Sequence, residues 1–90
     1  MRPDEPKYAY TYAFYLHQSG KTSDAVEVLQ GMVDRQTPYA DAYIMLGQVY
    51  EQQGKLKDAV KVYSKAANNK KLPEYQRRSF SSRIKQIQGK

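Results

Sequence analysis

The sequence predicts an all-α fold, built from two helix-turn-helix units and a fifth helix. Apolar side chains recur every three or four residues along most of the chain, which is the spacing of one face of an α-helix. The sequence also repeats itself, because residues 18–28 and 52–62 lie 34 positions apart and are identical at seven of eleven positions. No segment alternates with period two, as a half-buried β-strand does. We therefore expect helices and no sheet.

The first two helices are expected over residues 5–19 and 22–36, separated by Gly20. Glycine reaches the left-handed backbone conformation that ends many helices at little steric cost. The hydroxyl of Thr22 or Ser23 is expected to cap the second helix. The apolar positions that indicate these two helices are Ala9, Tyr12, Ala13, Leu16, Ala25, Val28, Leu29 and Met32.

The third and fourth helices are expected over residues 38–53 and 56–69, separated by Gly54. Thr37 offers a capping hydroxyl for the third helix, and Pro38 suits its first position because the fixed φ of proline matches a helix. The apolar positions that indicate these two helices are Tyr43, Leu46, Gly47, Tyr50, Ala59, Val62, Tyr63 and Ala66.

A fifth helix is expected over residues 73–88. Pro73 is expected at its first position, as Pro6 is in the first helix. Asp24 and Asp58 fall in the first turns of the second and fourth helices, where the helix dipole favours negative charge. The breaks in the sequence therefore agree with the apolar periodicity.

The length and composition indicate one small domain over residues 1–90. The chain has no cysteine, which excludes disulfides, zinc-thiolate sites and thiol nucleophiles. It also has no apolar run near the roughly 18 residues that a membrane span needs. We expect a soluble domain, and the composition is compatible with the cytoplasm and with an exported compartment.

The 34-residue period and the residues that recur with it resemble the tetratricopeptide repeat. The resemblance implies a right-handed superhelix with repeat 1 over residues 6–39, repeat 2 over residues 40–73 and a capping helix over residues 74–88. Met32 departs from the family pattern, which usually has a small residue there. The family's signature residues are packing residues, and here they are Ala13, Leu16, Gly20, Ala25, Leu46, Gly47, Tyr50, Gly54, Ala59, Tyr63 and Ala66.

The last segment continues the same register. Phe80, Ser81 and Ile84 fall 34 residues after Leu46, Gly47 and Tyr50, so it looks like the first helix of a third unit used as a cap. Residues 86–90 resemble the turn sequence again, shifted by one position. We therefore expect the chain to be part of a larger protein.

The resemblance also implies a function, because in this family the first helix of each unit lines a concave groove. We expect this chain to be a protein-protein interaction module that binds a peptide or a partner segment there. The alternative for Phe14 and Ile44 is that they pack on one another or on the capping helix. The predicted groove residues are Lys7, Tyr10, Phe14, His17, Asp41, Ile44, Met45, Gln48, Glu51, Arg78 and Lys85, with Tyr75, Ser79 and Ser82 beside them.

One branch of the family grips the C-terminal carboxylate of a chaperone with Lys and Asn at fixed groove positions. Those positions here hold Tyr10, Phe14, Ile44 and Gln48, so the resemblance does not extend to that clamp. Binding of a free acidic C-terminus is therefore not expected.

Charge is distributed unevenly along the chain. Residues 1–54 carry 4 basic and 7 acidic side chains, net −3, whereas residues 55–90 carry 11 basic and 2 acidic side chains, net +9. Lys57, Lys61 and Lys65 repeat every four residues and so share one helix face. An alternative function is thus a helical adaptor that binds an anionic partner through residues 55–90, and a solvated convex face is the plainer interpretation. Nucleic acid is disfavoured, because few aromatic side chains interleave with the basic cluster to stack on bases.

No pattern indicates catalysis. His17 is the one histidine, and near the end of a helix it is better placed to meet terminal carbonyls or solvent than to act as a general base. No phosphate-binding loop, metal-binding loop or nucleophile elbow occurs. We therefore expect no enzyme activity, no cofactor and no metal. A further possibility is self-association through the exposed ends of the helical stack.

Overall fold

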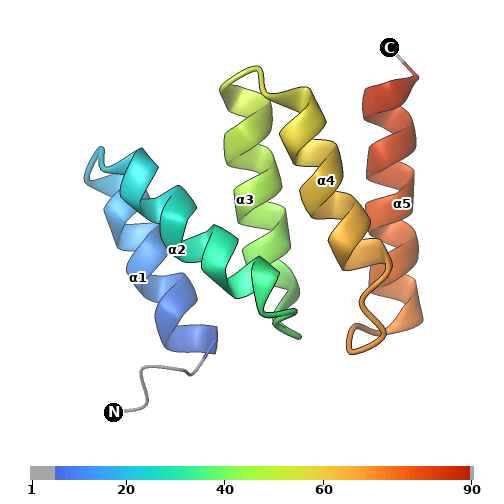
Figure 1. The fold of residues 1–90 in the computed structure, drawn as a ribbon, viewed down its shortest axis with the longest axis horizontal. Coiled ribbons are helices and arrows are strands. Elements are labelled where there is room, and N and C mark those ends of the chain that lie inside the picture. The colour runs from blue at the N-terminus through green and yellow to red at the C-terminus, as the bar shows by residue number, and fades with distance from the viewer. Residues whose placement is uncertain (1–5, 90) are drawn as a thin grey trace.

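The computed structural model describes residues 6–89, and within them the chain forms α-helices and no strand. The predicted all-α fold is thus confirmed. Residue 5, where the first helix was expected to begin, lies outside the described residues. The five helices in this range are α1 (Pro6–Gln18), α2 (Thr22–Asp34), α3 (Ala40–Gln52), α4 (Leu56–Ala67) and α5 (Glu74–Gln88) (Figure 1).

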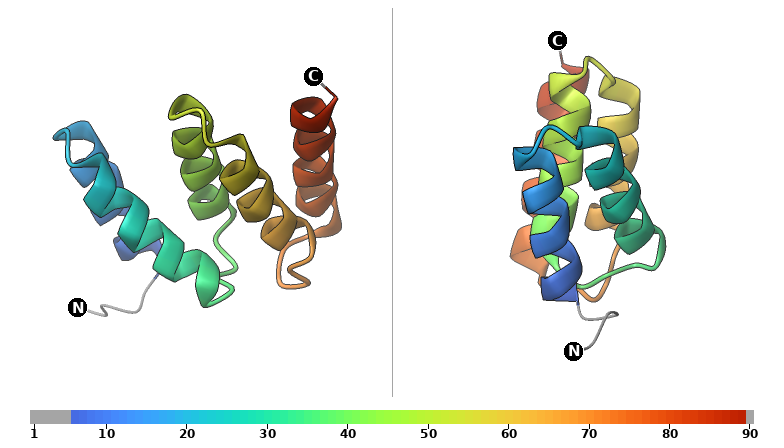
Figure 2. Two further views of the ribbon diagram at one scale, coloured as in Figure 1. Left: turned by 45° about the horizontal axis from the view of Figure 1, so that its top comes forward. Right: turned by 90° about the vertical axis from the view of Figure 1, so that its left-hand side faces the viewer.

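The helices form two layers. The right-hand view of Figure 2 shows α1, α3 and α5 on one side and α2 and α4 on the other. Contacts follow the order of the chain, with α1 on α2, α2 on α3, α3 on α4 and α4 on α5. The molecule is a slab with extents of 39 × 28 × 16 Å. This arrangement matches the superhelix of helix pairs that the resemblance implies.

The two turns within the helix pairs have the same geometry. Gly20 and Gly54 have φ values of +83° and +76°, in the left-handed region that glycine tolerates best. The backbone N–H of Lys21 donates to the carbonyl of Leu16, and that of Lys55 to the carbonyl of Tyr50, both at 2.8 Å. These bonds satisfy carbonyls that the helix ends leave free.

Helix α2 begins at Thr22 as predicted, but the predicted capping by a hydroxyl was wrong. Its N-cap is Lys21, with no side-chain cap, and Thr22 is already helical. The Thr22 hydroxyl shares a hydrogen bond of 3.1 Å with His17 Nδ1 across the turn. Only Lys21 lies between the left-handed Gly20 and the first residue of α2. Thr22 and Ser23 are therefore already part of the helix and do not cap it.

The start of α3 was predicted too early. The helix begins at Ala40, and Pro38 precedes it. Gln36 has a left-handed φ of 57°, which turns the chain before Thr37. The Thr37 side chain is buried and accepts a 3.3 Å hydrogen bond from the N–H of Tyr39 instead of capping the helix. Tertiary contacts of the loop thus displace the helix start by two residues.

Pro73 is the N-cap of α5 and not its first residue. It keeps the φ that proline requires, −57°, but its ψ of 150° is extended. Its carbonyl accepts hydrogen bonds from the N–H groups of Gln76 and Arg77, as an N-cap carbonyl does. The helix therefore begins at Glu74, one residue later than expected.

The core is built from small residues under large ones. A methyl group placed on Gly47 would lie 2.3 Å from carbons of the Tyr63 ring. Helices α3 and α4 can therefore pack this closely only because Gly47 has no side chain. Leu16 and Tyr50 are half-buried. Of the signature residues, the fully covered ones are Ala13, Ala25, Leu46, Ala59 and Ala66, each 0% exposed.

Helix α5 closes the end of this core. Phe80 is buried, and its ring centroid lies 6.0 Å from that of Tyr43 and 5.9 Å from that of Tyr63. Arg83 lies over the Tyr63 ring at 5.9 Å. An aromatic cluster and a cation thus hold the capping helix on α4.

Candidate functional site

A hollow of about 200 Å³ opens between α1 and α3, the first helices of the two units. Both helices belong to one layer, visible on one side in the right-hand view of Figure 2. Seven of the predicted groove residues lie around this hollow. The residues that line it are Tyr10, Phe14, His17, Asp41, Ile44, Met45, Gln48, Val49 and Gln52.

The apolar part of this hollow is partly open to solvent. Phe14 is 41% exposed and Ile44 39% exposed, whereas Met45 and Val49 are buried beneath them. The Phe14 ring makes an edge contact with Tyr15 of its own helix at 6.1 Å. Packing within the chain therefore leaves a large part of both Phe14 and Ile44 uncovered.

The two ends of the hollow have different chemistry. At the start of α3, the Tyr10 and Tyr39 rings meet edge to face at 5.4 Å. Burial, followed by the nearby charge of Asp41, raises the pKa of Tyr10, so its hydroxyl stays neutral. Asp41 is exposed in the first turn of α3 and takes part in none of the ion pairs among residues 6–89. At the other end, His17 is held by its hydrogen bond to Thr22.

Glu51 is not in this hollow. Its Oε2 accepts a 2.6 Å hydrogen bond from the Tyr63 hydroxyl and lies 3.5 Å from both Nε and Nη2 of Arg83. Burial first, and then the hydrogen bond to Glu51, raise the pKa of Tyr63 to about 12. The carboxylate of this predicted groove residue thus links α3, α4 and α5.

The remaining predicted groove residues lie apart from the hollow. Arg78 is exposed and pairs with Glu74 of its own helix at 3.5 Å. Lys7 and Lys85 are exposed and line none of the hollows described here, and the same holds for Tyr75. The structure therefore does not bring the predicted groove residues of α5 to the hollow between α1 and α3.

A second hollow, of about 560 Å³, lies where α2 and α4 end and was not predicted. Its wall includes Asn69, whose side chain is buried in the loop after α4. Asn69 Nδ2 donates to the carbonyl of Thr37 at 3.0 Å and to the Tyr43 hydroxyl at 2.8 Å. The other residues that line this hollow are Val33, Asp34, Gln36, Tyr43, Ser64, Lys65, Asn68, Lys70 and Lys71.

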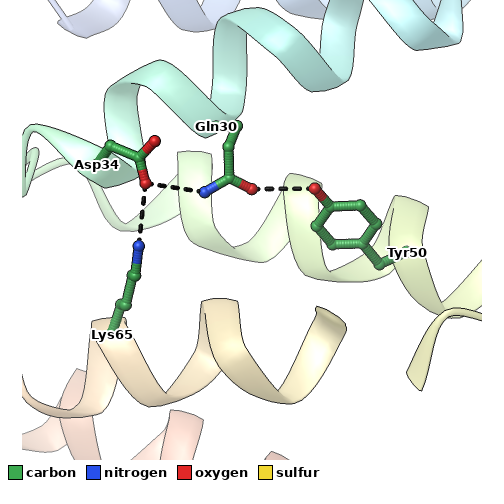
Figure 3. A network of polar contacts seen from close by, with 4 residues as sticks. All are labelled: Gln30, Asp34, Tyr50 and Lys65. Atoms are coloured by element: carbon green, nitrogen blue, oxygen red, sulfur yellow. Dashed lines mark hydrogen bonds and ion pairs between the residues drawn. The ribbon is translucent and has the colours of Figure 1, made fainter. Parts of the chain in front are cut away.

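A polar network beside this second hollow joins α2, α3 and α4 (Figure 3). Gln30 donates to Asp34 Oδ1 at 3.0 Å and accepts from the Tyr50 hydroxyl at 2.9 Å. Lys65 Nζ lies 2.9 Å from the same oxygen of Asp34. The hydrogen bond from Lys65 is the main reason that the pKa of Asp34 is lowered. This network links the two repeat units. It includes Lys65, one of the three lysines that share a face of α4.

The described part of the chain offers no group of three His, Asp or Glu side chains that could hold a metal ion. None of the helices within residues 6–89 is long and apolar enough to cross a membrane.

Paired antiparallel helices, left-handed glycine turns at a fixed spacing and small residues under aromatic rings define a helix-turn-helix repeat protein. The chain belongs to the tetratricopeptide repeat family, whose model matches residues 16–77. No curated protein and no solved structure matches the chain at a significant level. Tetratricopeptide repeats are generally scaffolds for protein-protein interaction, and membership of the family suggests the same general role for this chain.

Proposed function

We propose that the chain binds a peptide or partner segment across α1 and α3, with an apolar side chain of the partner seated in the hollow between them. The observation that carries the proposal is the half-exposed pair Phe14 and Ile44 above the buried floor of Met45 and Val49. Apolar side chains that stay partly uncovered beside a hollow gain most from a partner that covers them.

The charges around the hollow favour one orientation of the partner. Asp41 lies at the hollow and forms no ion pair there, so a basic or N–H group of the partner meets α3. Arg78 and Lys85 lie on α5, in the same layer, and favour acidic groups further along the segment. Such charges mainly set orientation and association rate, and the apolar anchor supplies most of the affinity.

The test begins with a random peptide library selected on the immobilised chain. The affinities of the selected peptides are then measured by isothermal titration calorimetry for the wild type, Phe14→Ala and Ile44→Ala. We expect the peptides to share an aromatic or aliphatic anchor and each substitution to weaken binding by about tenfold or more. Leu56→Ala is the matched control, because Leu56 is 46% exposed on α4, in the other layer.

Two results would contradict the proposal. One is equal affinity of the selected peptides for the wild type, Phe14→Ala and Ile44→Ala. The other is selection of acidic peptides whose binding falls steeply with salt and is abolished by Lys61→Glu. That second result would assign binding to the basic region 55–90.

A further inference from the structure

The second hollow, where α2 and α4 end, carries an excess of positive charge. It lies along the edge at which the loop before α3 and the loop before α5 come together (Figure 1), joined by the hydrogen bonds of Asn69. The charged residues that line it are Lys65, Lys70, Lys71 and Asp34. Three cations therefore surround a single anion.

The chain itself already neutralises the one acidic group of this hollow. Lys65 Nζ lies 2.9 Å from Asp34 Oδ1, and Gln30 donates to the same oxygen at 3.0 Å (Figure 3). Lys70 and Lys71 are exposed and belong to none of the ion pairs in the described part of the chain. Two positive charges at the hollow are thus left uncompensated.

The charges next to the hollow do not cancel this excess. Arg35, the C-cap of α2, is a further cation. Glu74, the first acidic residue after the loop, lies 3.5 Å from Arg78 of its own helix. The negative ends of the α2 and α4 dipoles point toward this edge, but loop N–H groups already donate to the carbonyls of Val33 and Ala66.

The size and the lining of the hollow favour a peptide over a free ion, a nucleic acid or a lipid. A volume of about 560 Å³ is in the range of sites that enclose drug-sized ligands, far more than one inorganic anion needs. Gln36, Ser64 and Asn68 supply donors and acceptors for a peptide backbone. Tyr43 and Val33 are buried, so the wall offers no ring to stack on a base and no apolar group to insert into a membrane.

We propose that this hollow is a second binding site, which takes a peptide segment rich in Asp and Glu and places its carboxylates on Lys70 and Lys71. A lysine ammonium is a point charge on a flexible stem, so the site reads the charge of the segment more than the exact order of its residues. The hollow lies apart from the one between α1 and α3. One copy of the chain can therefore hold an acidic segment and an apolar anchor together.

The test is fluorescence anisotropy of a labelled oligoglutamate peptide, titrated with the purified chain in about 0.15 M salt, where charges more than about 8 Å apart are screened. We expect saturable binding, which oligoglutamine of the same length does not show. Lys70→Glu/Lys71→Glu should weaken this binding by about tenfold or more.

Lys57→Glu/Lys85→Glu is the matched control for this double substitution. It changes the net charge by the same amount, at exposed positions that line none of the hollows described above. We expect it to bind oligoglutamate within about twofold of the wild type, because its charges lie away from the bound peptide. Circular dichroism checks that all variants stay folded.

Asp34 provides a test of the opposite sign. Asp34→Asn removes the carboxylate that holds Lys65, and Lys65 then becomes a third cation available to the peptide. We expect this variant to bind oligoglutamate about threefold more tightly. Asp24→Asn adds the same charge at an exposed position in the first turn of α2, the other end of that helix, and should bind like the wild type.

The site is located by NMR, in which oligoglutamate should shift the backbone amide signals of residues 68–71 and leave those of α1 unchanged. Phe14→Ala should bind oligoglutamate like the wild type, so this proposal and the proposed function fail separately.

Three results would overturn the proposal. The first is the absence of saturable oligoglutamate binding. The second is an equal loss in Lys70→Glu/Lys71→Glu and Lys57→Glu/Lys85→Glu, which is the sign of a general effect of charge. The third is tighter binding of single-stranded DNA or of phosphatidylserine vesicles with the same dependence on Lys70 and Lys71, which would assign the hollow to a nucleic acid or a membrane surface.

Discussion

At Gly47 the contact between two helices depends on the absence of a single methyl group. The Gly47→Ala side chain would lie 2.3 Å from carbons of the Tyr63 ring, and this ring also holds Phe80 and Arg83 of the capping helix. We expect the substitution to destabilise the protein by about 1–3 kcal/mol, because the ring and α5 must both shift. Urea unfolding followed by circular dichroism measures the loss.

Gly31→Ala is the matched control for this prediction. Gly31 is also helical, but its added methyl group would lie 3.7 Å from the end of the flexible Arg35 side chain, an ordinary contact. Because alanine is the better helix former, we expect Gly31→Ala to stabilise the protein by roughly 0.5–1 kcal/mol. Equal changes in the free energy of unfolding for Gly47→Ala and Gly31→Ala would show that the Tyr63 ring does not limit the size of the side chain at position 47.

The hydroxyl of Tyr63 links stability to alkaline pH. Its pKa is raised to about 12 in the folded chain, by burial and then by the hydrogen bond to Glu51, against about 10 when the chain is unfolded. The folded state therefore favours the neutral phenol. Its stabilising contribution, about 3 kcal/mol for a difference of about two pKa units, is present below pH 10 and is lost as pH rises toward 12.

This pH dependence is tested with Tyr63→Phe. The free energy of unfolding of the wild type and of the variant is measured from about pH 9 to about pH 12. We expect the wild type to lose more stability across this range than the variant does. Burial also raises the pKa values of Tyr10, Tyr43 and Tyr50, so the variant should still show part of the decline. Parallel curves would contradict the role given to Tyr63.

At the scale of the elements, two loops on the same edge of the molecule are joined by one side chain. Asn69, after α4, donates to the Thr37 carbonyl before α3, and its Oδ1 accepts from the N–H of Lys71 at 2.9 Å. We expect Asn69→Ala to destabilise the protein by about 1–3 kcal/mol, because these buried partners are left unpaired. Asn68→Ala is the control, since Asn68 is exposed and should change the unfolding free energy by less than about 0.5 kcal/mol.

The helices and their order could be predicted from the sequence because the apolar period and the two glycines are local signals. The start of α3 could not, because contacts with distant residues decide it. The capping of α2 and the shift of one residue at the start of α5 were not predicted either. Thr37 is the clearest case, since its carbonyl accepts from Tyr43 and from Asn69, 32 residues away.

The same distinction applies to the candidate site. Residues one helical turn apart, such as Tyr10 and Phe14, follow from periodicity, and the structure places them around one hollow. Glu51 has the same spacing as the groove residues of α3, but its partner Arg83 lies 32 positions away on the capping helix. No local pattern reveals that pairing. Whether the hollow binds a partner stays a prediction.

At the scale of the whole molecule, each end helix packs mainly on one neighbour and each central helix on two. In a stack whose units contact only their neighbours, the ends open more easily than the middle. We expect native-state amide hydrogen exchange to be fastest in α1 and α5 and slowest in α3 and α4. Equal protection of α1 and α3 would show that the molecule opens only as a single unit.

The matching turns at Gly20 and Gly54 have a consequence for how such a protein can grow. Since the two bends share the same φ region and the same closing bond, an in-frame duplication running from one bend to the next would use only joints that the chain already contains. The copied stretch would insert a further hairpin without a new kind of junction, and the layer of α1, α3 and α5 would widen by one helix. The length of this layer can therefore change by whole modules while the chemistry of each junction stays constant.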